Sequence, residues 1–173
     1  MMLVRSVLAL AVLTGLVSGG AALAQQKSQF LGAFQDWEAY AGSEGRSKVC
    51  YAVTQPGKEE GQYSRRGEVY LFVTHRPGDH EQNAVNVKAG YTYKPGSTVN
   101  AAIGNSTFAM YVKDDTAWNR TGQDDRNMVH AMIKGATLVV RGTSDRGTAT
   151  TDTFSLKGFS AAYQAIGKAC GVK

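Results

Sequence analysis

The chain has 173 residues, 19% of which are charged, and its formal net charge at pH 7 is +5. This basic excess is small and spread along the chain, with no run of lysine and arginine longer than two. A nucleic-acid-binding protein or a polybasic membrane-binding protein is therefore not expected, and the length suits one domain with its own hydrophobic core.

The N-terminus has the features of an export signal. Arg5 precedes a short apolar segment over residues 6–18, and Ala-Leu-Ala at 22–24 has the small residues that a signal peptidase needs. The apolar segment falls well short of the roughly 20 residues that cross a bilayer as a helix. We therefore expect a signal peptide over 1–24 and a single mature domain over 25–173, with a retained membrane anchor as the alternative.

Two cysteines, Cys50 and Cys170, lie in the expected mature chain. An even number of cysteines in an exported protein favours a disulfide bond, which here would close a loop of about 120 residues. Such a closure stabilises a fold by roughly 4–5 kcal/mol in the chain-entropy description. A pair of free thiols is the alternative. A catalytic cysteine is less favoured, because neither residue has a neighbouring histidine or a C-x-x-C context.

Beyond the signal, short apolar runs alternate with turn residues, as in antiparallel strands joined by hairpins. The polar stretch 56–67 has no periodicity and is expected to be a surface loop. Residues 68–74 are apolar on both faces, which is typical of a central strand covered from both sides. Strands are expected over 34–40, 46–55, 68–74, 83–91, 98–103, 107–112, 116–119, 136–143 and 148–156.

Two segments have helical periodicity instead. Residues 121–124 resemble a capping box with Asp in place of Glu, and apolar residues at helical spacing follow up to Gly135. Residues 159–170 form a second helix with one apolar stripe. Because Cys170 lies on that stripe, a disulfide would hold this helix against the sheet that carries Cys50. The whole pattern predicts a mainly β protein, an antiparallel β sandwich or partly open barrel with two short helices, one of them C-terminal.

The aromatic residues lie mostly on the expected strands, so core packing is their expected use. Tyr91 and Tyr93 form a small alternating set beside a turn, and with Lys94 they could offer a partner or a glycan an aromatic and basic patch. Packing is the favoured reading of these two tyrosines as well.

The stretch THRPGDH, residues 74–80, is the main candidate for metal binding. His75 and His80 flank a Pro-Gly pair, and Asp79 could be a third ligand for zinc or copper. No other segment obviously completes such a site, since His130 lies among apolar neighbours on the first expected helix. We therefore expect a plain turn, with no metal and no cofactor.

Enzymatic function has little support in the sequence. There is no G-x-S-x-G elbow and no glycine-rich phosphate loop. Three pairs of carboxylates lie close together in the sequence, and glycoside hydrolysis would require such a pair in a cleft. An envelope hydrolase or metal-dependent enzyme that uses a carboxylate or histidine cluster is therefore kept as the alternative function. The carboxylate pairs are Asp36 with Glu38, Asp114 with Asp115, and Asp124 with Asp125.

Several stretches give the chain a resemblance to a known family. They include FQDW, GRSKVCY and TTDTFSLKGFSAA, and their order along the chain is that of the invasion-associated locus B family, which the chain resembles over nearly its whole expected mature length. The matching stretches are 34–37, 45–51, 70–72, 76–78, 103–108, 134–135, 142–144 and 150–162.

The resemblance implies an exported protein of a Gram-negative bacterium with an immunoglobulin-like β sandwich and no catalytic motif. We expect a non-catalytic interaction module of the cell envelope, in the periplasm, at the outer membrane or secreted. Its expected partner is another envelope protein or a host protein, so a role in host-cell association is an open alternative. Nucleic-acid binding is not expected, nor is a transmembrane segment after removal of the signal.

Overall fold

The computed structural model describes residues 28–172, so the expected signal peptide over 1–24 lies outside the described part of the chain. Its elements are β1 (Gln29–Phe34), β2 (Trp37–Glu44), β3 (Ser47–Thr54), β4 (Lys58–Gly61), β5 (Tyr70–Arg76), η1 (Pro77–Asp79), β6 (Glu81–Lys88), β7 (Thr98–Ile103), β8 (Ser106–Lys113), β9 (Thr116–Trp118), α1 (Gly122–Lys134), β10 (Thr137–Thr143), β11 (Ala149–Ser155) and α2 (Phe159–Cys170).

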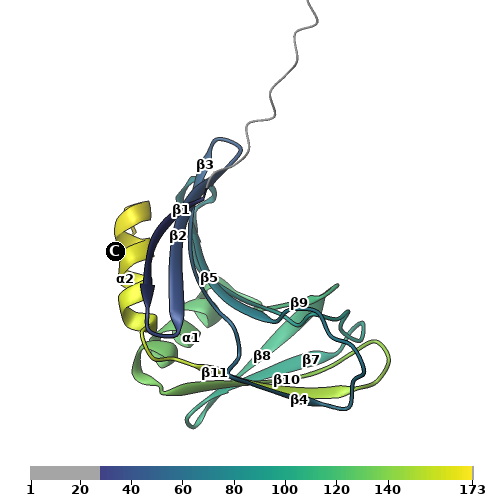
Figure 1. Ribbon diagram of the computed structural model, residues 1–173. Helices are drawn as coiled ribbons and strands as arrows, with labels where there is room; N and C mark the ends of the chain where they lie inside the picture. Colours follow the sequence, from purple (N-terminus) through teal and green to yellow (C-terminus); the bar gives the residue numbers. More distant parts are fainter. Residues whose placement is uncertain (1–27, 173) are drawn as a thin grey trace, which may run out of the picture.

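The strands form one open antiparallel sheet in the order β1-β2-β3-β5-β6-β9-β8-β7-β10-β11-β4. Figure 1 shows that this sheet is strongly curved, so that β1, β2 and β3 stand steeply across β10, β11 and β4. Helix α2 lies along β2 and β3, and α1 packs mainly on β6. The expected mainly β class, the antiparallel pairing and the two helices are confirmed, and the structure adds that a single continuous sheet contributes all the strands.

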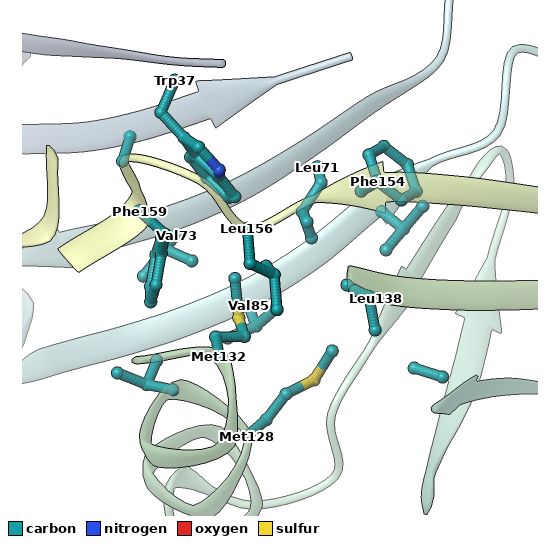
Figure 2. Close-up of a cluster of buried hydrophobic side chains, with 14 of the residues drawn as sticks. Trp37, Leu71, Val73, Val85, Met128, Met132, Leu138, Phe154, Leu156 and Phe159 are labelled. Atoms are coloured by element: carbon teal, nitrogen blue, oxygen red, sulfur yellow. The ribbon is translucent and has the colours of Figure 1, made fainter. Parts of the chain in front are cut away.

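The hydrophobic core joins both parts of the curved sheet to both helices (Figure 2). Trp37 of β2 is buried, and its ring centroid lies 4.8 Å from that of Phe159 of α2. Its indole N–H donates to the Ser155 carbonyl oxygen at 3.0 Å. Leu71 of β5 and Phe154 of β11 are also fully buried in this cluster. Since distant segments share one core, the curvature of the sheet is fixed by apolar burial.

Two strand predictions were wrong. The expected strand over 34–40 is broken by a tight turn, where Gln35 has a φ of 54°, and the residues before this turn form the separate strand β1. The expected loop over 56–67 contains β4, which pairs with β11 at the edge of the sheet. All four residues of β4 are exposed, so backbone pairing forms this strand without an apolar face that periodicity could reveal.

Both helices begin at residues suited to the position. The Thr121 hydroxyl accepts a hydrogen bond from the Asp124 N–H at 3.2 Å, which confirms the expected N-terminal cap of α1. At the start of α2, Gly158 has a φ of 87°, and a Cβ atom there would collide with the Phe34 carbonyl oxygen. Glycine at this position therefore lets α2 pack closely against the turn between β1 and β2.

Candidate functional site

A row of aromatic rings crosses one face of the sheet. In β3, Cys50 and Ala52 are buried on the side of α2, so Tyr51 between them points to the opposite face. Tyr40 of β2 pairs directly with Tyr51, and Phe30 of β1 pairs directly with Tyr40. The ring centroids of these three residues are 5.4 and 5.2 Å apart in succession. The three neighbouring rings therefore form one continuous aromatic surface.

The row extends onto β5 and then across the centre of the sheet. The ring centroid of Phe72 lies 6.2 Å from that of Tyr51, and the ring centroid of Tyr70 lies 5.7 Å from that of Phe72. On the same face, Asn86 pairs with both Phe72 and Trp118, and Trp118 pairs in turn with Tyr111. We refer to this set as the outer aromatic face, which consists of Phe30, Tyr40, Tyr51, Tyr70, Phe72, Tyr111 and Trp118.

The outer aromatic face is partly open to solvent. Phe30 is 54% exposed, Tyr111 is 40% exposed, and the other five rings are half-buried. Within residues 28–172, no second layer therefore covers this face. Core packing was expected for most of the aromatic residues, and these seven lie outside the core instead. Alternation along a strand separates two faces without saying which one is covered.

Two carboxylates orient the tyrosine hydroxyls at this face. The Tyr40 hydroxyl donates to Glu38 at 2.6 Å, and the Tyr70 hydroxyl donates to Glu68 at 2.8 Å. The hydrogen bond to Glu38 raises the pKa of Tyr40 to about 12, so the phenol stays protonated at neutral pH. The face thus combines apolar rings with fixed polar groups, a composition that is typical of protein-binding surfaces.

The structure separates the two histidines of the expected turn. Residues 77–79 form the short helix η1 between β5 and β6, as expected for a turn. His75 is fully buried, whereas His80 is exposed and has a φ of 55°. In the part of the chain that the structure describes, no group of three His, Cys, Asp or Glu side chains could hold a metal ion. His75 and His80 are not brought together with a third ligand.

His75 has a structural position next to the disulfide. Its Nδ1 atom accepts a hydrogen bond from the Asn83 backbone N–H at 3.1 Å, and its ring lies 5.4 Å from that of Tyr163 on α2. The Tyr163 hydroxyl donates to the Asn83 side-chain oxygen at 2.5 Å. His75 also pairs across the strands with Cys50. These contacts join β5, β6 and α2 around one buried imidazole.

Burial of His75 should make the fold sensitive to acid. Desolvation lowers the pKa of His75 to about 4, whereas an unfolded histidine titrates near 6.5. The unfolded chain therefore binds the extra proton first, and stability should fall by about 2–3 kcal/mol as the pH drops from about 6.5 to 4. In urea unfolding at several pH values, His75→Gln should flatten this slope. The matched variant His80→Gln removes an exposed imidazole, and an equal flattening there would contradict the assignment to His75.

Cys50 and Cys170 form the expected disulfide, with Cα atoms 6.0 Å apart and 120 residues between them in the sequence. Cys50 is fully buried on β3 and Cys170 is nearly so at the end of α2. The bond attaches the last helix to β3, an interior strand of the sheet, on the face opposite the outer aromatic face. Tyr51 thus lies on one side of β3, and the disulfide of its neighbour Cys50 lies on the other side.

A buried ion pair holds the loop that follows β4. The Arg66 guanidinium binds both carboxylate oxygens of Asp152 on β11, at 2.6 and 2.7 Å, and its Nε donates to the Ala89 carbonyl oxygen at 2.7 Å. It also lies over the rings of Tyr63 and Tyr91, at 5.4 and 5.0 Å from their centroids. Sequence reasoning missed this pair, because Arg66 and Asp152 are 86 residues apart and neither carries a motif.

The patch suggested for Tyr91, Tyr93 and Lys94 is used mostly for packing. Tyr93 is buried, and the Tyr91 hydroxyl shares a hydrogen bond of 2.6 Å with Thr150 of β11. The two tyrosine rings meet edge to face at 5.2 Å. The favoured packing interpretation is therefore confirmed for both tyrosines.

The carboxylate pairs have different surroundings. Asp125 is partly buried in α1 and accepts hydrogen bonds from the Val85 N–H and the Asn119 side chain, both at 3.0 Å; burial raises its pKa. Asp36 and Glu38 line a shallow hollow of about 430 Å³ beside Tyr70. Asp125 thus joins α1 to β6 through hydrogen bonds. Asp36 and Glu38 lie at the border of the outer aromatic face.

The described helices contain no segment long and apolar enough to cross a membrane. The model of a family described as invasion associated locus B (IalB) protein matches residues 37–167. The crystal structure of invasion associated protein B from Bartonella henselae superimposes with a TM-score of 0.56 and 15% sequence identity, and the match covers 81% of this chain and 94% of that one. This likeness shows a shared fold. Among curated protein sequences, none matches the chain.

Proposed function

The chain belongs to the invasion associated locus B family, and on this basis we propose that it is an exported, non-catalytic binding protein of the Gram-negative cell envelope. Export is supported by the signal pattern over residues 1–24 and by the bond between Cys50 and Cys170, since disulfides persist mainly in oxidising compartments outside the cytoplasm. The periplasm, with contact to the outer membrane, is the proposed location.

One observation carries the binding function. Strand β5 is apolar on both faces and lies inside the sheet between β3 and β6, yet its outer residues Tyr70 and Phe72 stay partly exposed within the described chain. Aromatic residues that share one open face of a rigid sheet offer a large contact area with little loss of side-chain entropy. Such surfaces mark interaction sites. The proposed partner is a protein with a complementary apolar surface, in the envelope or on a host cell.

The experiment is site-specific photocrosslinking in intact cells. A photoreactive phenylalanine analogue replaces Tyr51 or Phe72 in the outer aromatic face, and Arg141 in the control, which is exposed on the distant strand β10. We expect one discrete adduct from positions 51 and 72 and none from position 141. Equal labelling at all three positions, or no adduct at 51 and 72, would contradict the proposed surface.

The same surface should govern affinity for the captured partner. Tyr51→Ser with Phe72→Ser removes two central rings, and each hot-spot aromatic side chain contributes about 2 kcal/mol or more. We expect the dissociation constant, measured with purified partner, to rise by at least about thirtyfold. Arg141→Ser is the matched control, and circular dichroism checks that each variant is folded. A doubly substituted chain that binds as tightly as wild type would place the interface elsewhere.

A further inference from the structure

Three loops meet around a hollow of about 560 Å³, which is lined by none of the seven rings of the outer aromatic face. The hollow is lined by residues of 62–67, 90–92 and 144–148. The loops are tied to one another by backbone hydrogen bonds, from the Gly67 N–H to the Gly90 oxygen at 2.8 Å and from the Asp145 N–H to the Thr92 oxygen at 2.9 Å. The hollow therefore exists before any ligand binds, and little cost of ordering the backbone remains.

Arg66 holds the loop over residues 62–67 in place, but its own charge is already paired and is not available to a ligand. Its side chain is 3% exposed and its guanidinium is neutralised by Asp152 and by Glu59 at 3.3 Å. A buried pair of this kind costs desolvation energy, so it is better suited to fixing geometry than to adding stability. It positions the neighbouring Arg65 and the ring of Tyr63 at the hollow.

Two other arginines at the hollow carry charge that is not neutralised. Arg65 and Arg146 are exposed, line the hollow from different loops, and have no carboxylate within ion-pair distance among residues 28–172. Asp145 is the acidic residue that lines the same hollow. Among the residues that line the hollow, three arginines outnumber the one aspartate. The two guanidinium groups without an ion-pair partner suit a carboxylate or a phosphate, which arginine binds through paired N–H donors.

The rest of the lining suits a sugar ring. Tyr63 is 36% exposed although Arg66 covers one side of its ring, so aromatic surface remains at the hollow. Ser64 and Thr148 add hydroxyl groups that can both donate and accept hydrogen bonds. An aromatic ring with clustered hydroxyl groups matches the C–H face and the hydroxyl groups of a pyranose.

We propose that this hollow binds an acidic saccharide, a sugar ring that bears a carboxylate or a phosphate, with the anionic group held by Arg65 and Arg146 and the ring placed on Tyr63. This site uses other side chains than the outer aromatic face and goes beyond the proposed function, so either can fail without the other.

The experiment is a titration of the purified oxidised protein, followed by the amide NMR signals of the three loops. The probes are glucuronate, glucose phosphate, neutral glucose and inorganic phosphate. We expect saturable shifts with one or both acidic sugars, and the stronger of the two identifies the carboxylate or the phosphate as the natural group. Neutral glucose and inorganic phosphate should each bind at least about tenfold more weakly, since each lacks half of the contacts.

Variants test the assignment of the residues. Arg65→Gln and Arg146→Gln should each weaken binding of the stronger acidic sugar about tenfold, because each removes a charge-assisted hydrogen bond. Arg120→Gln changes an exposed arginine outside the hollow and should bind as wild type does. The proposal is overturned if neither acidic sugar gives a saturable shift, if inorganic phosphate binds as well as the sugars, or if R65Q and R146Q bind like R120Q.

Discussion

Replacing Cys50 and Cys170 together by alanine should lower the free energy of unfolding by about 4 kcal/mol. The bond closes a loop of 120 residues, and cross-linking a loop of this length restricts the unfolded chain strongly. Since whole domains are stable by only about 5–15 kcal/mol, the loss removes a large share of the total. It also frees α2 from β3, leaving that helix held by packing and by its contacts around His75.

The measurement is urea unfolding of C50A/C170A beside the oxidised wild-type protein. Reduced wild-type protein is the control, because it loses the bond but keeps the side chains, and it should show a similar loss. A change below about 1 kcal/mol in both samples would mean that the bond leaves the unfolded chain nearly unaffected. The fold would then depend on its core alone.

Replacing Arg66 by methionine should cost about 3–5 kcal/mol, because it leaves the carboxylate of Asp152 buried without its partner. Asp152 is 2% exposed, so water cannot take the place of the guanidinium without opening the loop. The loop from Gln62 to Gly67 should then detach from β11 and from Ala89, to which Arg66 also donates.

A double-mutant cycle separates the pair from its neighbourhood. R66M/D152L replaces both charges by apolar groups and should recover most of the stability that R66M loses, because no buried charge is left unpaired and Glu59 is exposed to solvent. Arg76→Met is the matched control, since Arg76 pairs with Glu44 and Glu81 at the surface and should cost less than about 1 kcal/mol. If R66M/D152L proves as unstable as the sum of its single variants, the two side chains do not act as a pair.

The features predicted correctly from the sequence are those set by local chemistry. Strand β7 occupies the expected residues, 98–103, because apolar alternation between two turn signals defines it fully. The cap at Thr121 and the apolar stripe of α2 likewise follow from side chains a few residues apart. The position of Cys170 on that stripe was enough to place the helix against the strand that carries Cys50.

The features that were missed depend on contacts between distant segments. Strand β4 is polar and forms because its backbone pairs with the backbone of β11, which would otherwise be the edge strand of the sheet. The outer aromatic face follows from the register of several strands, and alternation alone cannot tell that Tyr51 lies on the open face while Trp37 is buried. The hollow beside Arg65 and Arg146 arises where three loops meet, and no residue in those loops carries a recognisable motif.

The disulfide and the outer aromatic face support the same interpretation. Disulfides persist mainly outside the cytoplasm, and this one holds α2 against the inner side of β3. A sheet held from behind in this way can leave seven aromatic rings partly exposed on its other side, because the core of the fold does not need them. In the proposed binding function, the outer aromatic face contacts the partner.

Mass analysis of the protein isolated from cells under non-reducing conditions, after alkylation of free thiols, is the most direct test of export and oxidation. We predict a chain in the periplasmic fraction that begins at Gln25, with Cys50 and Cys170 joined and unmodified by the alkylating reagent. A chain that remains in the cytoplasmic fraction with its N-terminal segment intact and both cysteines alkylated would contradict export, and with it the proposed role in the envelope.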